Sequence, residues 1–520
     1  MKRLLALALA LVMLLGVMAG CSSKKETSAP GETTQNGETA ATETAHHDTL
    51  TVAGTAEPKG LDAHGVNDST SNMVKHVVYD TLLKRNQNGT PGPGLAESWE
   101  YVDDLTLILH IRQGVKFHNG EALDANDIVY NLNRAYNSDY TNWMVTTLDL
   151  ENTKATDDNT VEVKLTSPTG ALLTQLCFLY IVDMETVEGG VDQNETPIGT
   201  GPFVFKEWFR GDRLEFTTNQ EYWGTVAPFD TLVMRVITES SSRAMEIEAG
   251  GVDIIMGVAS NDMANLEANP EVNLLSAPSY GNVFIGMNCS AEPFNNKTLR
   301  QAINYALDKE AIVQAVYTGR GVVANGPISP TIWGYDPDLT GYPYDEAKAK
   351  ELLAEAGYPD GLEITMTVSD SQERIDIATI VQNQLGKIGV TVKVETLENA
   401  TYLDRIIAAS TQMYVLGWTT NTGDADYGLY EPFYTGMPTW CNTATYSNPA
   451  VDEQLDIGRT STDEATRLAA YKKVQEMIVD DAPWVFLCNK EETVACRSNI
   501  QGFVMSPCVR YDFNTITFAN

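Results

Sequence analysis

Basic residues are scarce in this sequence of 520 residues. It contains 35 Lys and Arg against 70 Asp and Glu, which gives a formal net charge of −35 at pH 7. Such an excess of acid repels the phosphate backbone of nucleic acids and the anionic surface of membranes. The composition therefore excludes a nucleic-acid partner and a polybasic membrane-binding face.

Long apolar runs are missing after the first 20 residues, so we expect the chain from about residue 49 onward to be soluble. Catalytic motifs are missing as well: the sequence has no His-Glu-x-x-His helix, no Gly-x-Ser-x-Gly turn and no phosphate-binding loop. Acid pairs such as Asp424 and Asp426 could in principle hydrolyse a substrate, but nothing sets a working separation between them. We expect neither an enzyme nor a cofactor.

Histidine and cysteine patterns give no metal site. The six histidines show no chelating spacing, and the seven cysteines, at positions 21, 177, 289, 441, 488, 496 and 508, match no zinc motif. An exported protein can form disulfides. Cys488 and Cys496 could flank a hairpin and pair with each other; free thiols in the mature chain are the alternative.

The N-terminus has the three parts of an export signal. Lys2 and Arg3 precede an apolar run over residues 4–17, which is too short for a comfortable membrane helix. Small residues then lead to Cys21. This ending resembles a bacterial lipobox, which implies cleavage before Cys21 and lipidation of its thiol. An ordinary signal peptide with an accidental Cys is the alternative.

Residues 21–48 read as a flexible tether. The segment is rich in Ser, Thr, Glu, Gln, Gly and Ala and has no large apolar residue, so it cannot bury enough surface to order itself. A tether of this kind would span roughly 28 Å. Lipids on Cys21 would hold the folded part of the chain beside the extracytoplasmic face of the cell membrane.

The remaining chain is too long for one hydrophobic core and predicts at least two lobes. Residues 49–280 read as β-rich with interspersed helices, and residues 283–486 as α/β. Within the second stretch, strands at 362–368, 390–394 and 413–418 alternate with helices, which predicts a parallel sheet with right-handed crossovers. After Trp484 the pattern turns to short strands at 485–488 and 492–496. The chain thus returns to the first lobe, and two crossings near 278–284 and 484–492 would form a hinge.

Helix ends are also readable in this stretch. Asp345 and Gly357 bound a predicted helix, with an acidic start and a glycine stop. Residues 461–464 (STDE) resemble a capping box, which places Ser461 at the N-cap of a helix through Asp481.

An ordered set of motifs resembles the peptide/nickel class, family 5, of extracytoplasmic solute-binding proteins of ABC importers. The motifs cover the mature chain in order: residues 95–99 (LAESW), 107–120 (LILHIRQGVKFHNG), 125–129 (ANDIV), 197–203 (PIGTGPF), 221–224 (EYWG), 299–309 (LRQAINYALDK) and 347–357. Later segments at 417–426, 446–449 and 482–484 are most similar to dipeptide- and glutathione-binding members.

The resemblance implies a two-lobe α/β fold of the periplasmic-binding-protein type, with a hinge and an extra subdomain. Lobe I would comprise residues 49–91, 200–281 and 487–520, the subdomain residues 92–199, and lobe II residues 282–486. It also implies that a peptide-like ligand binds between the lobes, that closure around it permits docking on membrane permease subunits, and that the protein acts as a monomer.

Two loops at the carboxyl ends of the predicted parallel strands are candidate ligand contacts. Arg374, at a helix start, would bind a ligand carboxylate; a solvated first-turn arginine is the alternative. Asp424 corresponds to the family aspartate that pairs with a peptide's α-amino group, with Asp426 as its substitute; a capping turn residue is the alternative. Other candidates that could line the cleft are Trp418, Tyr427, Trp440 and Tyr280, and the first lobe would add contacts from Thr55 to Glu57.

Three other functions stay open. Nickel binders share this family, so a nickel or haem carrier is one alternative. A sensor with the same binding chemistry is another, and a peptide-directed enzyme is the third. Equilibrium binding of nickel or turnover of peptides would distinguish them.

Overall fold

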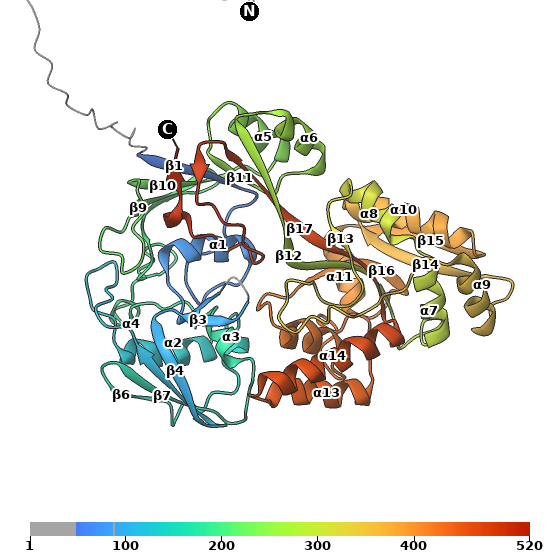
Figure 1. Ribbon diagram of the computed structural model, residues 1–520, viewed down its shortest axis with the longest axis horizontal. Helices are drawn as coiled ribbons and strands as arrows, with labels where there is room; N and C mark the ends of the chain where they lie inside the picture. Colours follow the sequence, from blue (N-terminus) through green and yellow to red (C-terminus); the bar gives the residue numbers. More distant parts are fainter. Residues whose placement is uncertain (1–47, 87–88, 520) are drawn as a thin grey trace, which may run out of the picture. The chain divides into compact units, whose positions relative to one another are not determined.

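The computed structural model describes residues 48–86 and 89–519 (Figure 1). It confirms a mixed α/β fold, organised around an 11-stranded sheet with the order β15-β14-β16-β12-β17-β11-β1-β10-β9-β8, to which β13 adds a pairing with β17. No helix in the described part of the chain has the length and apolarity of a membrane span. The predicted signal peptide, Cys21 and nearly all of the tether lie outside the described residues.

Lobe I is built on one end of this sheet. Of its five strands, the two nearest the middle of the sheet are largely buried, and the next two alternate buried apolar and more exposed residues. The five strands are β1 (Thr49–Gly54), β8 (Phe203–Phe209), β9 (Arg213–Thr218), β10 (Thr231–Val236) and β11 (Ile254–Met256). The helices are α1 (Ser69–Val78), α5 (Ser240–Glu248) and α6 (Ser260–Ala268), and short strand pairs are β2 (Leu83–Arg85) with β3 (Pro91–Pro93) and β18 (Ile500–Gln501) with β19 (Thr517–Phe518).

The subdomain carries its own antiparallel sheet, in the order β4-β5-β7-β6. The strands are β4 (Ala96–Asp103), β5 (Thr106–Ile111), β6 (Lys154–Asp157) and β7 (Thr160–Lys164), with helices α2 (Ala125–Tyr136), α3 (Leu172–Leu176) and α4 (Met184–Glu188). A capping box starts α2: the Asp124 carboxylate accepts from the backbone N of Asp127, and the Asp127 carboxylate accepts from the backbone N of Asp124. A separate apolar core fills this subdomain.

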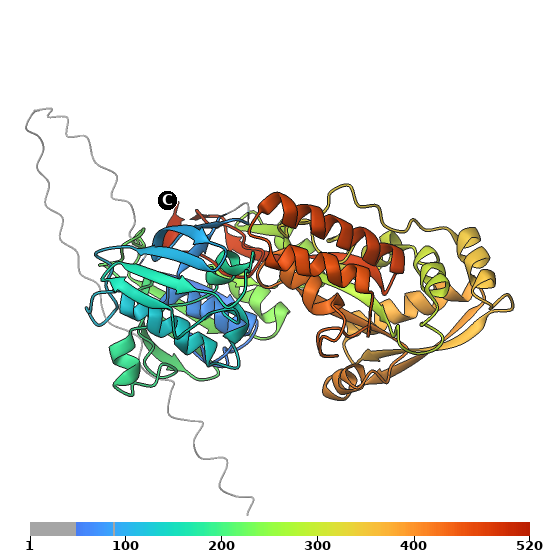
Figure 2. The same cartoon turned by 90° about the horizontal axis from the view of Figure 1, so that it is seen from below.

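Lobe II contains the predicted parallel unit. Strand β14 (Leu362–Ser369) pairs in parallel with both β15 (Val390–Leu397) and β16 (Met413–Thr419), and helices α10 (Gln372–Gly386) and α11 (Asn399–Ile407) connect them. The other elements are α7 (Lys297–Tyr305), α8 (Lys309–Tyr317), β13 (Val322–Val323), α9 (Glu346–Glu355), α12 (Glu431–Phe433), α13 (Pro449–Thr460) and α14 (Glu464–Asp481). Figure 2 shows α13 and α14 packed side by side.

Two long antiparallel strands join the lobes: β12 (Val272–Met287) and β17 (Trp484–Arg497). Their register is interrupted between Pro278 and Asn282, within one of the predicted crossings. The prediction of a hairpin near Cys488 and Cys496 is wrong, because both lie on the continuous strand β17. Eight residues of strand place their Cα atoms about 26 Å apart, far beyond the 7 Å that a disulfide allows. All six cysteines of the described residues are free.

The predicted cap of α14 is also wrong by two residues. Its N-cap is Asp463, whose carboxylate accepts from the backbone N of Thr466 at 2.8 Å. Ser461 instead ends α13 as its C-cap. The two helices follow each other so closely that the polar segment between them contains the end of one and the start of the next, and aspartate is as good an N-cap as serine.

Candidate functional site

A cavity of about 350 Å³ lies between the lobes at the middle of β12 and β17. Lobe II contributes Thr419 and Asn421, and the subdomain contributes Trp143 and Phe178. Lobe I and the connecting strands provide the rest of the wall: Asn67, Asp68, Ser69, Asn72, Ser279, Gly281, Lys490, Glu492, Pro507, Cys508, Val509 and Arg510. A ligand in this cavity would contact both lobes at once.

Two of the four charged side chains in the wall already have protein partners. Lys490 forms an ion pair with Glu373 at 3.0 Å, and Asp68 caps α1 by accepting from the backbone N of Ser71 at 3.0 Å. Glu492 differs: among the described residues its carboxylate has no hydrogen bond or ion pair. Burial raises the pKa of Glu492, and the charge of Lys490 only partly offsets this.

Arg510 is the positive counterpart of Glu492. Its guanidinium carbon lies 4.1 Å from the centre of the Phe178 ring and 5.1 Å from that of Tyr180. The rings hold the guanidinium plane without using its N–H groups. Within the described part of the chain, no carboxylate forms an ion pair with Arg510. The cavity thus offers one carboxylate and one guanidinium that are free to bind a ligand.

An aromatic series connects the subdomain to lobe II beside the cavity. The ring of Trp143 lies 5.6 Å from that of Tyr427, which stacks on Trp418 at 5.7 Å. The predicted residues Trp418 and Tyr427 are therefore adjacent to the cavity wall through Trp143. The indole Nε1 of Trp418 is buried and has no hydrogen-bond partner among the described residues.

The two predicted aspartates lie in lobe II, where each is paired with an arginine. Asp424 is 1% exposed, and Nη2 of Arg467 lies 2.9 and 3.1 Å from its two carboxylate oxygens. Asp426 accepts two hydrogen bonds from Arg459, at 2.9 and 3.0 Å. Neither aspartate lines the cavity. The predicted role of Asp424 toward a ligand amine would require breaking a buried ion pair.

Arg374 also lies away from the cavity wall. It donates to Oγ of Ser369 at 3.0 Å and to Oδ1 of Asn399 at 3.3 Å, and its guanidinium carbon is 5.1 Å from the centre of the Tyr402 ring. The predicted loop reaches the edge of the cavity through its neighbour Glu373, by the ion pair with Lys490.

The other predicted contact residues differ in whether they lie at the cavity. Tyr280 is buried between the lining residues Ser279 and Gly281, and its ring faces the guanidinium of Arg85 at 5.4 Å. Trp440 is 60% exposed and does not line the cavity. Thr55 is exposed, and Glu57 accepts from the indole of Trp208 at 2.9 Å and from the backbone N of Gly211 at 2.8 Å. None of these last three residues contacts the cavity.

Direct contacts join the lobes around the cavity. Nη2 of Arg85 donates to the carbonyl of Gly423 at 2.7 Å, and Oγ1 of Thr174 donates to Asp424 at 3.3 Å. The backbone N of Gly170 donates to the carbonyl of Arg459 at 2.8 Å, and a side chain at Gly170 would lie 2.0 Å from the carbonyl oxygen of Ser461. These contacts describe a closed arrangement of subdomain and lobe II.

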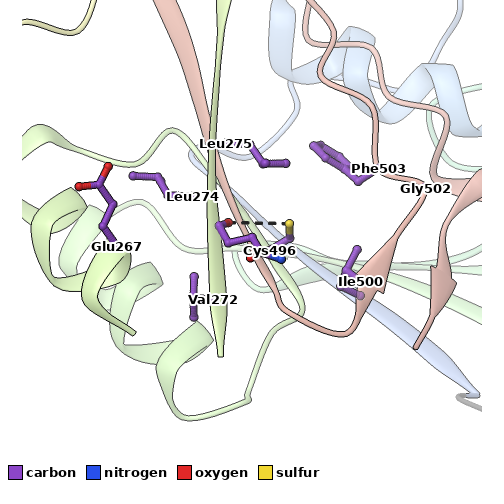
Figure 3. Close-up of a pocket in the computed structure, with 9 residues that line it drawn as sticks. Glu267, Val272, Leu274, Leu275, Cys496, Ile500, Gly502 and Phe503 are labelled. Carbon is purple, nitrogen blue, oxygen red and sulfur yellow. Dashed lines mark hydrogen bonds between the residues drawn. The ribbon is translucent and has the colours of Figure 1, made fainter. Parts of the chain in front are cut away.

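A second pocket, of about 450 Å³, lies in lobe I at the start of β12 (Figure 3). Five of its nine lining residues have large apolar side chains: Val272, Leu274, Leu275, Ile500 and Phe503. The one charged side chain in its wall, Glu267, pairs with Arg320. This pocket offers no free charge to orient a polar ligand.

The described residues contain one group of acids close enough to share a metal ion: Asp127, Asp183 and Glu185 of the subdomain. Asp127 and Asp183 already accept hydrogen bonds at the starts of α2 and α4, and none of the three lines the cavity. No histidine lines the cavity either.

Comparison with known proteins gives a consistent picture. The family described as bacterial extracellular solute-binding proteins, family 5 (middle), matches residues 90–438. Heme-binding protein A of Haemophilus influenzae is 31% identical over 86% of this chain and 88% of the relative, and a glutathione-binding protein of Pectobacterium atrosepticum is 31% identical over 87% and 91%. A periplasmic binding protein of Helicobacter pylori, solved with the peptide STSA, is 29% identical, covers 90% of this chain and 98% of its own, and has a TM-score of 0.76.

Sequence reasoning missed Glu492, Lys490 and Arg510, because it looked for charges at the ends of the lobe II strands and near the first strand of lobe I. A signal was present. The segment after Trp484 was predicted to cross between the lobes and to complete lobe I, so charged residues on it were placed at the cleft by the topology alone.

Proposed function

The chain belongs to the bacterial extracellular solute-binding proteins of family 5, and from this premise we propose that it binds a short peptide or a glutathione-like ligand between its lobes and delivers it to an ABC importer. The observation that carries this proposal is the cavity at the junction of the lobes. Its volume of about 350 Å³ is at the small end of the roughly 300–1,000 Å³ range of ligand pockets, which favours a short ligand over a long one.

The chemistry of the cavity supports a zwitterionic ligand. A buried charge costs several kcal/mol when it has no partner, so a ligand with free amino and carboxyl groups needs opposite charges in the wall. The cavity supplies both signs, together with amide and hydroxyl groups and the rings of Trp143 and Phe178. A purely apolar ligand would leave these polar groups unpaired.

Ligand binding is coupled to lobe closure in this proposal. The ligand contacts both lobes and thereby shifts an existing equilibrium between open and closed forms. The hydrogen bonds of Arg85 with Gly423 and of Thr174 with Asp424 would form on closure and stabilise the form that docks on the permease.

We place the protein at the outer face of the cell membrane, as a monomer held by lipids on Cys21. The extracellular location follows from the family, whereas lipidation and the tether rest on the N-terminal sequence. Mass spectrometry of the mature protein from its native membrane tests this part: a diacylated N-terminal Cys21 is expected, and an unmodified Cys21 or a cut elsewhere contradicts the anchor.

A thermal-shift screen with dipeptides, tetrapeptides, glutathione, nickel and heme tests the proposed ligand class. At a concentration of 100 times Kd, a ligand adds about 2.7 kcal/mol of stability, which corresponds to roughly 5–10 °C in Tm for lobes of this size. A peptide or glutathione should give this shift. If only nickel or heme raises Tm, the peptide assignment is wrong and the protein carries a metal or heme instead.

A further inference from the structure

Two charged side chains in the cavity wall have neither a hydrogen bond nor an ion pair on their charged groups among the described residues, and both lie on segments adjacent to the hinge, not on the lobe II loops. Glu492 is in β17, opposite Ala277 of β12, and Arg510 follows in the loop after β18. The lobe II aspartates are both paired with arginines. Of the two carboxylates in the wall, that of Asp68 accepts hydrogen bonds from Ser71 at the start of α1, so in the described part of the chain the carboxylate of Glu492 is the one left free for a ligand amine.

Within the described residues, no cation near Glu492 is free to balance the negative charge of its carboxylate. The nearest cation on the same strand, Lys490, is held by Glu373 at 3.0 and 3.2 Å. Adjacent strand residues point to opposite faces, and Glu491 accordingly turns away to accept a hydrogen bond from Ser276. Burial raises the pKa of Glu492 because it destabilises the charged form of the carboxyl group. A bound ammonium group would supply the missing charge.

The guanidinium of Arg510 is the free positive group among the described residues of the wall. It is held against Phe178 and Tyr180, and the buried ammonium group of Lys75 is close enough that Arg510 contributes, after burial itself, to lowering the pKa of Lys75 to about 7. Lys75 donates to the carbonyls of Ala63 and Val66, so it neutralises no carboxylate of a ligand directly. A planar fork of free N–H groups suits a carboxylate.

We propose that Glu492 binds the α-ammonium group of the peptide and Arg510 binds its carboxylate, so that the cavity selects short peptides with both termini free. The assignment rests on the proposed function. It replaces the expectation that Asp424 and Arg374 hold these groups, because those two side chains are engaged within lobe II and do not reach the wall.

Calorimetric titration of the purified protein with four probes tests the assignment: Ala-Phe, Ala-Ala-Phe, N-acetyl-Ala-Phe and Ala-Phe-amide. The variants are Glu492→Gln and Arg510→Gln, with Glu491→Gln and Arg210→Gln as matched controls. Glu491 is on the same strand but faces away, and Arg210 is an exposed arginine paired with Glu195. Arg510→Lys adds a variant that keeps the charge but loses the fork.

The expected result is a matched pattern of losses. In the wild type, blocking either terminus should weaken binding by at least about 30-fold, since removing one partner of a buried charge pair has an effect of this size. Glu492→Gln should weaken the binding of free Ala-Phe by a similar factor, and acetylation of the peptide should then cause no further loss of affinity. Arg510→Gln should weaken the binding of free Ala-Phe by a similar factor, with no further loss for Ala-Phe-amide. The affinity of Arg510→Lys for Ala-Phe should lie between those of the wild type and Arg510→Gln. Both control variants should bind Ala-Phe with the affinity of the wild type.

Other outcomes would overturn the assignment. If the wild type binds Ala-Phe or Ala-Ala-Phe but Glu492→Gln loses the same factor for free and acetylated peptides, Glu492 does not bind the amine. Full affinity in both variants, with unchanged melting of the ligand-free protein, leads to the same conclusion. A wild type that binds none of the peptides overturns the assignment. If glutathione also fails to raise Tm in the thermal-shift screen, the proposed function itself is contradicted.

Discussion

The buried ion pair between Asp424 and Arg467 allows a sharp distinction between a structural and a ligand-binding aspartate. Their side chains are 2% and 7% exposed, and the closest nitrogen–oxygen distance is 2.9 Å. Arg467 also donates to the carbonyl of Gly458 at 3.0 Å and lies over the ring of Trp333, with 4.4 Å between guanidinium carbon and ring centre. We expect Asp424→Asn and Arg467→Met to destabilise the protein strongly.

The magnitude follows from what each substitution leaves behind. At about 3 Å and an effective dielectric constant near 20, the attraction is about 5 kcal/mol, most of it offset by the desolvation of both groups. Removing one partner leaves the other charge buried without compensation, at a cost of about 3–5 kcal/mol. The double variant removes both charges and should recover about 1–3 kcal/mol of the summed loss. The exposed pair Lys348–Glu351 is the control, where Glu351→Gln should cost under about 0.5 kcal/mol.

Urea unfolding of the ligand-free protein measures these free energies, and titration with Ala-Phe and N-acetyl-Ala-Phe adds the functional reading. We expect Asp424→Asn to lose stability and to change affinity for both peptides by the same factor. The reasoning is refuted if Asp424→Asn unfolds within about 1 kcal/mol of the wild type and loses affinity only for the free amine. That result would restore Asp424 as the partner of the ligand.

Four further predictions concern pH, packing, capping and closure. Burial, with a smaller contribution from Arg510, lowers the pKa of Lys75 to about 7, so the folded protein binds fewer protons than the unfolded chain between pH 7 and 9. In urea unfolding, the stability of the wild type should therefore rise by about 2 kcal/mol over this pH window relative to that of Lys75→Met. Equal pH slopes for the two proteins would contradict the pKa shift. Gly286→Ala should destabilise by about 1–3 kcal/mol because the new Cβ would lie 2.3 Å from the Tyr414 ring, whereas Gly386→Ala, with no atom within 4 Å, should be neutral or slightly stabilising in the same assay. Asp463→Ala should cost about 1 kcal/mol and Ser461→Ala under about 0.5 kcal/mol, the reverse of what a cap at Ser461 would give. Saturating peptide should reduce the radius of gyration measured by X-ray scattering, because the lobes close around the ligand, and superimposable profiles with and without peptide would contradict closure.

Much of the fold was predictable because it depends on local periodicity. The alternation of apolar residues in 362–368 and 390–394, with a helical pattern between them, was enough to predict the parallel strands β14 and β15. Strand β17 was not predictable as one element. Residues 489–492 in its middle are polar, and two of them, Lys490 and Glu492, line the cavity. A polar interruption in a buried strand has the same pattern as a turn.

The candidate site was less predictable because pairing between distant side chains has no local signal. Asp424 and Arg467 are 43 residues apart, and nothing in either loop indicates that α14 brings the arginine onto the aspartate. In the same way, Arg510 and Phe178 are far apart in the sequence and meet only in the folded protein. The sequence located the cleft between lobes, but the identity of its free charges required the structure.

The most direct test of the account is a crystal structure of the protein with a bound dipeptide. The account predicts the peptide in the cavity between the lobes, with its ammonium group at Glu492, its carboxylate at Arg510 and at least one contact to Asn421 of lobe II. A peptide bound in the lobe I pocket beside Phe503, or at the interlobe site with its amine on Asp424 and Arg467 displaced, would contradict it.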